Sequence, residues 1–256
     1  MHKYTILQFD KIGFSYEKDK EFIRELSFTV SDREFIGLLG ANGSGKSTIL
    51  KLASGILNPS IGSIRLWGRP LQSFRHKDRA KLLSYLPQIL DMNVPFRVRE
   101  LVAMGLYPYD IIPKITLSEA LEMVGLEGKS DLHIKNLSGG ERRRAFIAIT
   151  LLQGAGLLLL DEPLANLDIK YQVEVIKLLR ELREKKNISI IMALHDINMA
   201  LQFEKVMLIK EGKILGMGNP EIVLSRDLLK EAFDVAIEAR GFQTAYEIGN
   251  TGLLGE

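Results

Sequence analysis

The sequence contains no cysteine, only one tryptophan and no long uninterrupted apolar segment. Without cysteine, the chain can form neither disulfide bonds nor thiolate metal sites. No apolar run approaches the roughly eighteen residues that a membrane-spanning helix needs, and residues 1–5 lack the apolar core of a signal peptide. The net charge of +2 gives no reason to expect binding to nucleic acid or to an anionic membrane by charge alone. We therefore expect a protein of the cytosol, or one that reaches a membrane through a partner.

Apolar residues make up 46% of the 256 residues and charged residues 26%, which is the ordinary balance of a globular protein. Alternating apolar and polar residues predict antiparallel strands at 6–9, 12–16 and 26–30. From residue 34 onward, short apolar runs alternate with helical patterns, which predicts an α/β fold with a mostly parallel sheet. The expected strands of this part are 34–39, 63–67, 82–86, 157–160 and 188–192.

Strand patterns disappear over residues 89–135, where helical spacing at 98–104 and 117–124 predicts a helical insertion of about fifty residues. Residues 206–216 predict a β-hairpin. Two helical patches after Glu221 lead to a second small hairpin, expected over 234–246. Further helices are expected at 48–53, 75–81, 142–152 and 170–185.

Residues 40–48, Gly-Ala-Asn-Gly-Ser-Gly-Lys-Ser-Thr, fit the pattern of a phosphate-binding loop that links a strand to a helix. Glycines allow successive backbone N–H groups to point at phosphate oxygens, and the following helix presents its N-terminus to the same anion. Lys46 can reach the β- and γ-phosphates, and the Ser47 hydroxyl can ligate Mg²⁺. The predicted nucleotide contacts from this loop are Gly40, Asn42, Gly43, Ser44, Gly45, Lys46, Ser47 and Thr48.

An acidic pair, Asp161 and Glu162, follows the apolar run 157–160. In α/β sheets, ligands bind beyond the carboxyl ends of the strands. Asp161 is then positioned to hold the Mg²⁺ shell, and Glu162 can accept a proton from an attacking water. The alternative is a carboxylate that caps the start of a helix.

The order of these features resembles the ATP-binding subunit of ABC transporters. The phosphate loop is followed by Gln88 after a strand, by Leu-Ser-Gly-Gly-Glu at 137–141, by Leu-Leu-Leu-Leu-Asp-Glu-Pro at 157–163 and by His195 after a strand. The resemblance covers residues 4–235 and implies a single ABC ATPase domain over 1–256, built on a phosphate-loop NTPase core. It implies an antiparallel β subdomain, a helical subdomain at about 89–150 and a C-terminal extension at about 218–256.

The resemblance also implies a role for individual residues. Tyr16 matches the aromatic residue that stacks on adenine. Gln88 matches the glutamine that senses Mg²⁺ and the permease, and His195 matches the switch histidine at the γ-phosphate. Residues 138–140 match the signature that contacts ATP on the opposite subunit, and Asp168 matches the loop that couples the two sites. The implied catalytic residues are Lys46, Gln88, Glu162 and His195, the implied Mg²⁺ ligands are Ser47, Gln88 and Asp161, and the remaining implied nucleotide contacts are Tyr16, Ser138, Gly139, Gly140 and Asp168.

The implied assembly is a head-to-tail homodimer in which each ATP lies between the phosphate loop of one chain and the signature of the other. The resemblance further implies separate permease subunits, contacted near Gln88 and the helical subdomain, an extracytoplasmic substrate-binding protein, and a peripheral position on the cytoplasmic face of the membrane.

Two departures from the family pattern lie near the phosphate contacts. The signature ends in Glu141 where glutamine is frequent, and residues 165–166 read Ala-Asn where Ser-Ala is common.

Residues 85–88, 94–105 and 218–224 resemble ATPases of importers for iron-siderophore, haem and cobalamin, although Leu106 stands where many siderophore relatives have arginine. Importers of molybdate, zinc or manganese look similar, and a soluble ABC ATPase, such as one for iron–sulfur cluster assembly, is another alternative.

Two further alternatives fit less well. A chromosome-maintenance or DNA-repair ATPase has long coiled coils between loop and signature, where this chain has about ninety residues. A pure binding module would need neither Glu162 nor His195. The arginine run 142–144 predicts a solvated helix face rather than a nucleic-acid site.

Overall fold

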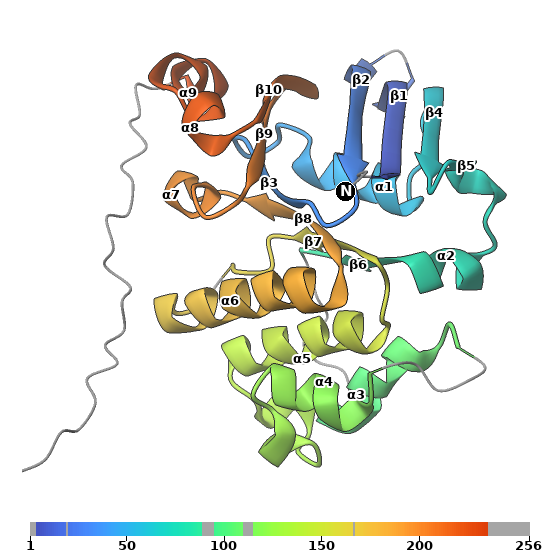
Figure 1. Ribbon diagram of the computed structural model, residues 1–256, viewed down its shortest axis with the longest axis vertical. Helices are drawn as coiled ribbons and strands as arrows, with labels where there is room; N and C mark the ends of the chain where they lie inside the picture. The colour runs from blue at the N-terminus through green and yellow to red at the C-terminus, as the bar shows by residue number, and fades with distance from the viewer. Residues whose placement is uncertain (1–3, 19, 89–94, 110–114, 166, 235–256) are drawn as a thin grey trace, which may run out of the picture.

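The computed structural model describes residues 4–18, 20–88, 95–109, 115–165 and 167–234. Figure 1 shows an antiparallel sheet at one end of the molecule, a parallel sheet in the middle and a group of helices at the other end. The α/β class expected from the sequence is confirmed.

The central sheet has six strands in the order β10-β9-β3-β8-β7-β6. β3, β6, β7, β8 and β9 run parallel to one another, and β10 at the edge pairs antiparallel with β9. The bounds are β3 Phe35–Leu39, β6 Leu83–Leu86, β7 Leu157–Asp161, β8 Ser189–Leu194, β9 Lys205–Lys210 and β10 Lys213–Gly218. The predicted strands at 34–39, 82–86, 157–160 and 188–192 and the predicted hairpin of residues 206–216 are therefore confirmed, whereas the predicted strand at 63–67 lies in the antiparallel sheet.

The uninterrupted apolar runs arise because the parallel strands are buried on both faces. Along β7, Leu158 and Leu160 pack into the core on the helical side, while Leu157 and Leu159 pack into the core shared with the antiparallel sheet. β3 and β8 divide their residues between the two cores in the same alternating way. Both faces of the sheet are therefore covered by apolar packing, and polar residues lie at its carboxyl edge.

The second sheet has the order β2-β1-β4-β5 and is antiparallel throughout. Its strands are β1 Thr5–Glu17, β2 Lys20–Ser31, β4 Ile61–Leu66 and β5 Arg69–Pro70. The prediction of two separate strands at 6–9 and 12–16 is wrong, because both belong to β1. Lys11 has a positive φ of 49°, and the pairing with β2 shifts between Phe9 and Ile12, so the strand bends without ending.

The helices expected from the sequence are confirmed, including the two patches near and after Glu221, whereas α7 was not predicted. α5 packs against α3 and α4, and α6 lies between α5 and the sheet in Figure 1. The bounds are α1 Lys46–Ser54, α2 His76–Leu82, α3 Val98–Ala103, α4 Leu117–Met123, α5 Gly139–Leu152, α6 Ile169–Lys186, α7 Ile197–Ala200, α8 Pro220–Val223 and α9 Arg226–Phe233.

Short 3-10 helices cover η1 Leu71–Ser73, η2 Met104–Leu106, η3 Glu127–Lys129 and η4 Ile134–Asn136. The second hairpin, expected over 234–246, lies outside the described residues except for Asp234. Across the described ranges, no helix has both the length and the apolar character needed to cross a bilayer.

Candidate functional site

The phosphate loop connects β3 to α1, and its curvature depends on glycine. Gly43 and Gly45 have φ angles of 78° and 113°, which side chains other than glycine rarely adopt. A Cβ atom on Gly40 would lie 2.3 Å from the backbone oxygen of Ile209, so no larger residue fits there. The loop therefore closes tightly against β9.

Lys46 begins α1 and is almost completely buried, with 5% of its surface exposed. Its Nζ donates hydrogen bonds to the backbone oxygens of Gly40 at 2.7 Å and Ala41 at 3.1 Å, so the ammonium lies inside the loop. Burial lowers the pKa of Lys46, while the carboxylates of Glu162 and Asp161 act in the opposite direction. A cation held here at low exposure suits a strongly anionic ligand such as a polyphosphate.

Asp161 ends β7 and is 1% exposed. Ser47 Oγ donates to Oδ1 of Asp161 at 3.1 Å, and the Tyr85 hydroxyl donates to Oδ2 at 3.3 Å. Burial raises the pKa of Asp161, and the hydrogen bonds from Ser47 and Tyr85 counteract that rise. No sequence pattern indicated a role for Tyr85, although its place on β6, the strand next to β7, brings it to the same edge of the sheet.

Glu162 joins two residues that come from other strands. Gln88, which follows β6, donates through Nε2 to Glu162 Oε2 at 2.7 Å, and His195 Nδ1, after β8, lies 3.2 Å from Oε1. The backbone of Glu162 has a φ of 51°, in the left-handed region that costs free energy for a residue with a side chain. β6, β7 and β8 are neighbours in the sheet, and so the three residues converge at its carboxyl edge.

A cavity of about 530 Å³ opens where these residues meet the phosphate loop. Its volume and mixture of cationic, anionic and backbone groups suit a nucleotide with a divalent cation. Phe22, on β2, also lines this cavity and was not singled out from the sequence. The lining residues are Phe22, Asn42, Gly43, Gly45, Lys46, Ser47, Thr48, Gln88, Glu162 and His195.

Tyr16 lies beside this cavity without lining it. Its hydroxyl is 2.9 Å from Thr48 Oγ1, and its ring meets the ring of Phe22 edge-on at 5.6 Å between centroids. The residue is 57% exposed. An exposed aromatic ring next to the phosphate loop is available for stacking on a planar base.

The signature residues lie elsewhere on the molecule. Ser138 caps α5 in a reciprocal box in which Glu141 N donates to Ser138 Oγ at 3.3 Å and Ser138 N donates to a carboxylate oxygen of Glu141 at 3.0 Å. Lys129 pairs with Glu141, and these contacts lower the pKa of Glu141. The departure from glutamine at 141 therefore strengthens the start of α5.

None of Ser138, Gly139, Gly140 and Asp168 lines the cavity at the phosphate loop. Ser138, Gly139 and Asp168 are exposed, and Asp168 occupies the N-cap position of α6 without a side-chain hydrogen bond to the helix. The structure thus brings together the residues of the loop, the acidic pair, Gln88 and His195. It leaves the signature and Asp168 facing outward from the same chain.

The expectation that residues 142–144 form a solvated face is wrong for two of the three arginines. Arg143 is 5% exposed and donates to backbone oxygens that include Gln88 O at 2.9 Å. Arg144 is 8% exposed, with its guanidinium 4.3 Å from the ring centroid of Tyr171. Helical spacing contained the signal, because Arg143 lies four and eight positions before the buried Ile147 and Leu151.

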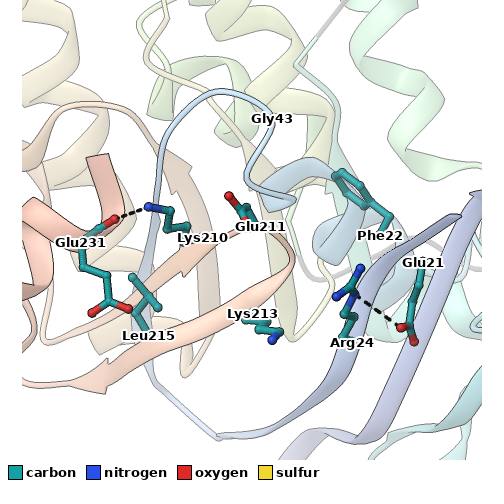
Figure 2. A pocket seen from close by; sticks show the side chains of 9 residues that line it. All are labelled: Glu21, Phe22, Arg24, Gly43, Lys210, Glu211, Lys213, Leu215 and Glu231. Carbon is teal, nitrogen blue, oxygen red and sulfur yellow. Dashed lines mark hydrogen bonds and ion pairs between the residues drawn. The ribbon is translucent and has the colours of Figure 1, made fainter. Parts of the chain in front are cut away.

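A second cavity of about 490 Å³ lies on the other side of Gly43, between β2 and the β9–β10 hairpin (Figure 2). Several of its charged side chains have partners. Arg24 pairs with Glu21 at 3.5 Å, and Lys210 donates to the Glu231 carbonyl at 2.6 Å. The turn of the hairpin supports the phosphate loop, since its Gly212 N–H donates to the Ser44 carbonyl at 2.8 Å.

Comparison with known proteins places the chain in a family. The ABC transporter family model matches residues 23–165, more than half of the chain. The petrobactin import ATP-binding protein FpuC of Bacillus anthracis is 37% identical over 224 residues, which are 84% of this chain and 82% of that protein. The hemin import ATP-binding protein HmuV of Rhodopseudomonas palustris is 36% identical over 227 residues, with 84% and 83% covered.

Among solved structures, cbiO1 from Clostridium perfringens, part of the ABC transporter complex cbiONQ, superimposes with a TM-score of 0.77 at 29% identity. The match covers 90% of this chain and 94% of that one. The phosphate loop, the convergent Gln88, Glu162 and His195, and these likenesses lead to one conclusion: the chain belongs to the ABC transporter family and is an ATP-binding, ATP-hydrolysing subunit of a membrane transporter.

Proposed function

We propose that the protein powers the import of a chelated metal, of the iron-siderophore or haem class, by binding and hydrolysing ATP at the cytoplasmic face of a membrane. The observation that carries the ATPase chemistry is the contact of Glu162 with Gln88 and His195 beside the buried Lys46. The cargo class is supported by the relatives, which are import ATP-binding proteins for petrobactin, iron(3+)-hydroxamate, hemin and ferric enterobactin.

The roles of the site residues follow from their chemistry. Lys46 and the backbone N–H groups of the phosphate loop bind the β- and γ-phosphates, and Tyr16 stacks on the adenine. Glu162 accepts the proton of the attacking water, while Gln88 and His195 hold its two carboxylate oxygens. In this arrangement, Gln88 couples the position of its loop to the position of the catalytic carboxylate, and His195 contacts the γ-phosphate.

The residues around Asp161 fit a magnesium ion. The Ser47 hydroxyl and the Asp161 carboxylate lie 3.1 Å apart, and Mg²⁺ is commonly bound by one or two such oxygens together with substrate phosphates. In the described part of the chain, no group of three His, Asp or Glu residues could form a metal cage of its own. Bound Mg²⁺ would neutralise charge on the phosphates, with Ser47, Asp161 and the Gln88 side chain around it.

We expect Tyr85→Phe to raise the Mg²⁺ concentration for half-maximal ATP hydrolysis by about two- to tenfold, since one hydrogen bond to Asp161 is lost. ATP binding measured without Mg²⁺ should not change. Tyr109→Phe is the matched control, because the Tyr109 hydroxyl donates to the Gln153 carbonyl at 2.7 Å in the helical subdomain. An unchanged Mg²⁺ dependence in Tyr85→Phe would contradict a role of Tyr85 at the metal site.

The outward position of the signature supports a head-to-tail homodimer. Ser138 and Gly139 are exposed at the N-terminus of the 14-residue helix α5, where backbone N–H groups favour an anion. In the dimer, each signature would close over the ATP held by the partner's phosphate loop. ATP would stabilise the closed dimer only because it binds the closed form more tightly than the open form.

Ser138→Arg should leave ATP binding to the single chain intact but lower steady-state hydrolysis by at least about tenfold, equivalent to 1.4 kcal/mol of lost transition-state stabilisation. Thr116→Arg is the control, because Thr116 caps α4 in the same kind of box with Glu119. Both variants lose a cap and gain a bulky cation, and only Ser138 faces the partner's ATP. Equal rates in the two variants would count against closure in trans.

The permease would dock beside Gln88 on the helical subdomain. Met104 and Tyr107, just after α3, are 46% and 73% exposed, and exposed apolar side chains of this kind are common in protein interfaces. We propose one ABC ATPase domain over residues 1–256, with a helical subdomain at about 89–150 and a C-terminal extension at about 218–256. An extracytoplasmic substrate-binding protein would complete the system and deliver the cargo.

The cargo proposal is tested by capture of tagged protein from native membranes, with mass spectrometry of what co-purifies. We expect a many-helix permease, and uptake of a ferric siderophore or haem when the complex is reconstituted in ATP-loaded proteoliposomes. Recovery of soluble partners alone would contradict the importer assignment. Uptake restricted to molybdate, zinc or manganese would contradict the cargo class.

A further inference from the structure

Arg143 connects the signature helix to both loops that carry the catalytic groups. It lies on α5, five positions after Ser138, and only 5% of it is exposed. Its guanidinium donates to four backbone oxygens, those of Gln88 at 2.9 Å, Asp161 at 3.2 Å, Pro163 at 3.2 Å and Glu162. One side chain therefore holds the segment after β6 and the segment after β7 in a fixed relation to α5.

The chemistry of arginine suits this position. A guanidinium presents its N–H donors in a rigid planar fork, so it can satisfy several carbonyls at once. Burial lowers the pKa of Arg143, while the charges of Asp161 and Glu162 act in the opposite direction and favour the cation. Arginine keeps its charge in proteins, so a cation lies beside the two carboxylates whose backbone it holds.

The residues that Arg143 joins through their backbones are also joined through their side chains. Gln88 Nε2 donates to Glu162 Oε2 at 2.7 Å, while Arg143 bridges the carbonyl oxygens of the same two residues. The Glu162 backbone has a φ of 51°, a strained conformation that persists only where its surroundings hold it. A shift of α5 would therefore change the position of the Glu162 carboxylate.

We propose that Arg143 is a positioning residue for ATP hydrolysis: from the signature helix, it sets the placement of Glu162 relative to Gln88, so that hydrolysis in a chain's own phosphate loop depends on where its α5 lies. This inference rests on the proposed function, in which Glu162 is the base and α5 carries the signature to the partner's ATP. Movement of the helical subdomain then moves the catalytic carboxylate of the same chain.

The test begins with Arg143→Met, which keeps an unbranched side chain of similar length but removes every donor. We expect kcat for ATP hydrolysis to fall by about 10²-fold, the scale of a displacement of about 1 Å at a catalytic group. KM for ATP should change by less than about threefold, because the phosphate loop is untouched. Arg143→Lys, with its charge kept and its fork lost, should give an intermediate kcat, and it carries the measurement if Arg143→Met does not fold.

Arg180→Met is the matched control. Arg180 lies on α6 and donates to the backbone oxygen of Gln202 at 2.6 Å and to its Oε1 at 2.8 Å. The Arg180→Met variant loses the same kind of guanidinium–carbonyl contact as Arg143→Met, and the melting temperature of both variants should fall. The kcat of Arg180→Met should stay at the wild-type value.

A double-mutant cycle separates positioning from general stability. If Arg143 acts through Glu162, adding Arg143→Met to Glu162→Gln should slow the residual single-turnover rate by less than about threefold, far from additive. A full additional loss of about 10²-fold, or a wild-type kcat in Arg143→Met, would overturn the inference while leaving the ATPase assignment intact. Turnover at the wild-type rate in Glu162→Gln would instead contradict the proposed function, in which Glu162 is the base.

Discussion

Glu162→Gln should lower steady-state ATP hydrolysis by about 10²–10⁴-fold, the usual contribution of a general base. Glutamine has nearly the same shape as glutamate and can still contact Gln88 and His195, but it cannot accept the proton of the attacking water. Lys46 and the phosphate loop are unchanged, so ATP should still bind. The unhydrolysed ATP should hold two chains together, and a dimer should accumulate.

Phosphate release and gel filtration with ATP measure the two parts of this result. Glu174→Gln is the control. Glu174 is exposed on α6, and its substitution makes the same chemical change away from the phosphate loop. It should hydrolyse ATP at the wild-type rate and should not accumulate as a dimer. A Glu162→Gln variant that stays monomeric with saturating ATP would argue against the shared site, and one with normal turnover would exclude Glu162 as the base.

Lys46→Ala should weaken ATP binding by at least about tenfold, since a hydrogen bond to a charged group contributes about 1.5–3 kcal/mol. The buried ammonium now donates to Gly40 O and Ala41 O, and alanine would also leave these loop carbonyls without their donor. Hydrolysis should fall to the background rate. Titration with a fluorescent ATP analogue and a phosphate-release assay measure the two effects.

The comparison for this variant is Lys177→Ala, which removes an exposed lysine from α6. It lowers the positive charge of the protein by the same amount without touching the phosphate loop. Wild-type ATP affinity in Lys177→Ala and its loss in Lys46→Ala would locate the effect at the loop. Normal affinity and turnover in Lys46→Ala would remove the basis for placing the phosphates there.

The sequence predicted most of this fold because its signals are local. The phosphate loop is one contiguous pattern. Uninterrupted apolar runs indicate the parallel strands, since both faces of the sheet are covered. Strand order is not local, so the contact of Gln88 with Glu162 needed the structure, which places β6 beside β7. The bend at Lys11 was missed because a bulge interrupts the alternation of side chains without ending the strand.

The arginine run 142–144 is not the solvated face predicted from the nearly balanced net charge. Net charge does not distinguish neighbouring arginines, but a helix gives each of them a different direction. Arg143 and Arg144 point inward, toward backbone carbonyls and Tyr171, and Arg142 donates to Leu137 O and Lys135 O at the start of α5. The spacing of Arg143 to Ile147 and Leu151 would have indicated burial, whereas no sequence pattern could have identified the four carbonyls.

The central claim is that two chains share each ATP site, and mixing two inactive variants tests it most directly. Lys46→Ala keeps its signature and Ser138→Arg keeps its phosphate loop, so a mixed head-to-tail dimer contains one complete site. If pairing is random, about half of the dimers are mixed and about a quarter of all sites are complete. We predict that ATP hydrolysis returns on mixing, toward about a quarter of the wild-type rate. A mixture as inactive as either variant alone would contradict the shared site.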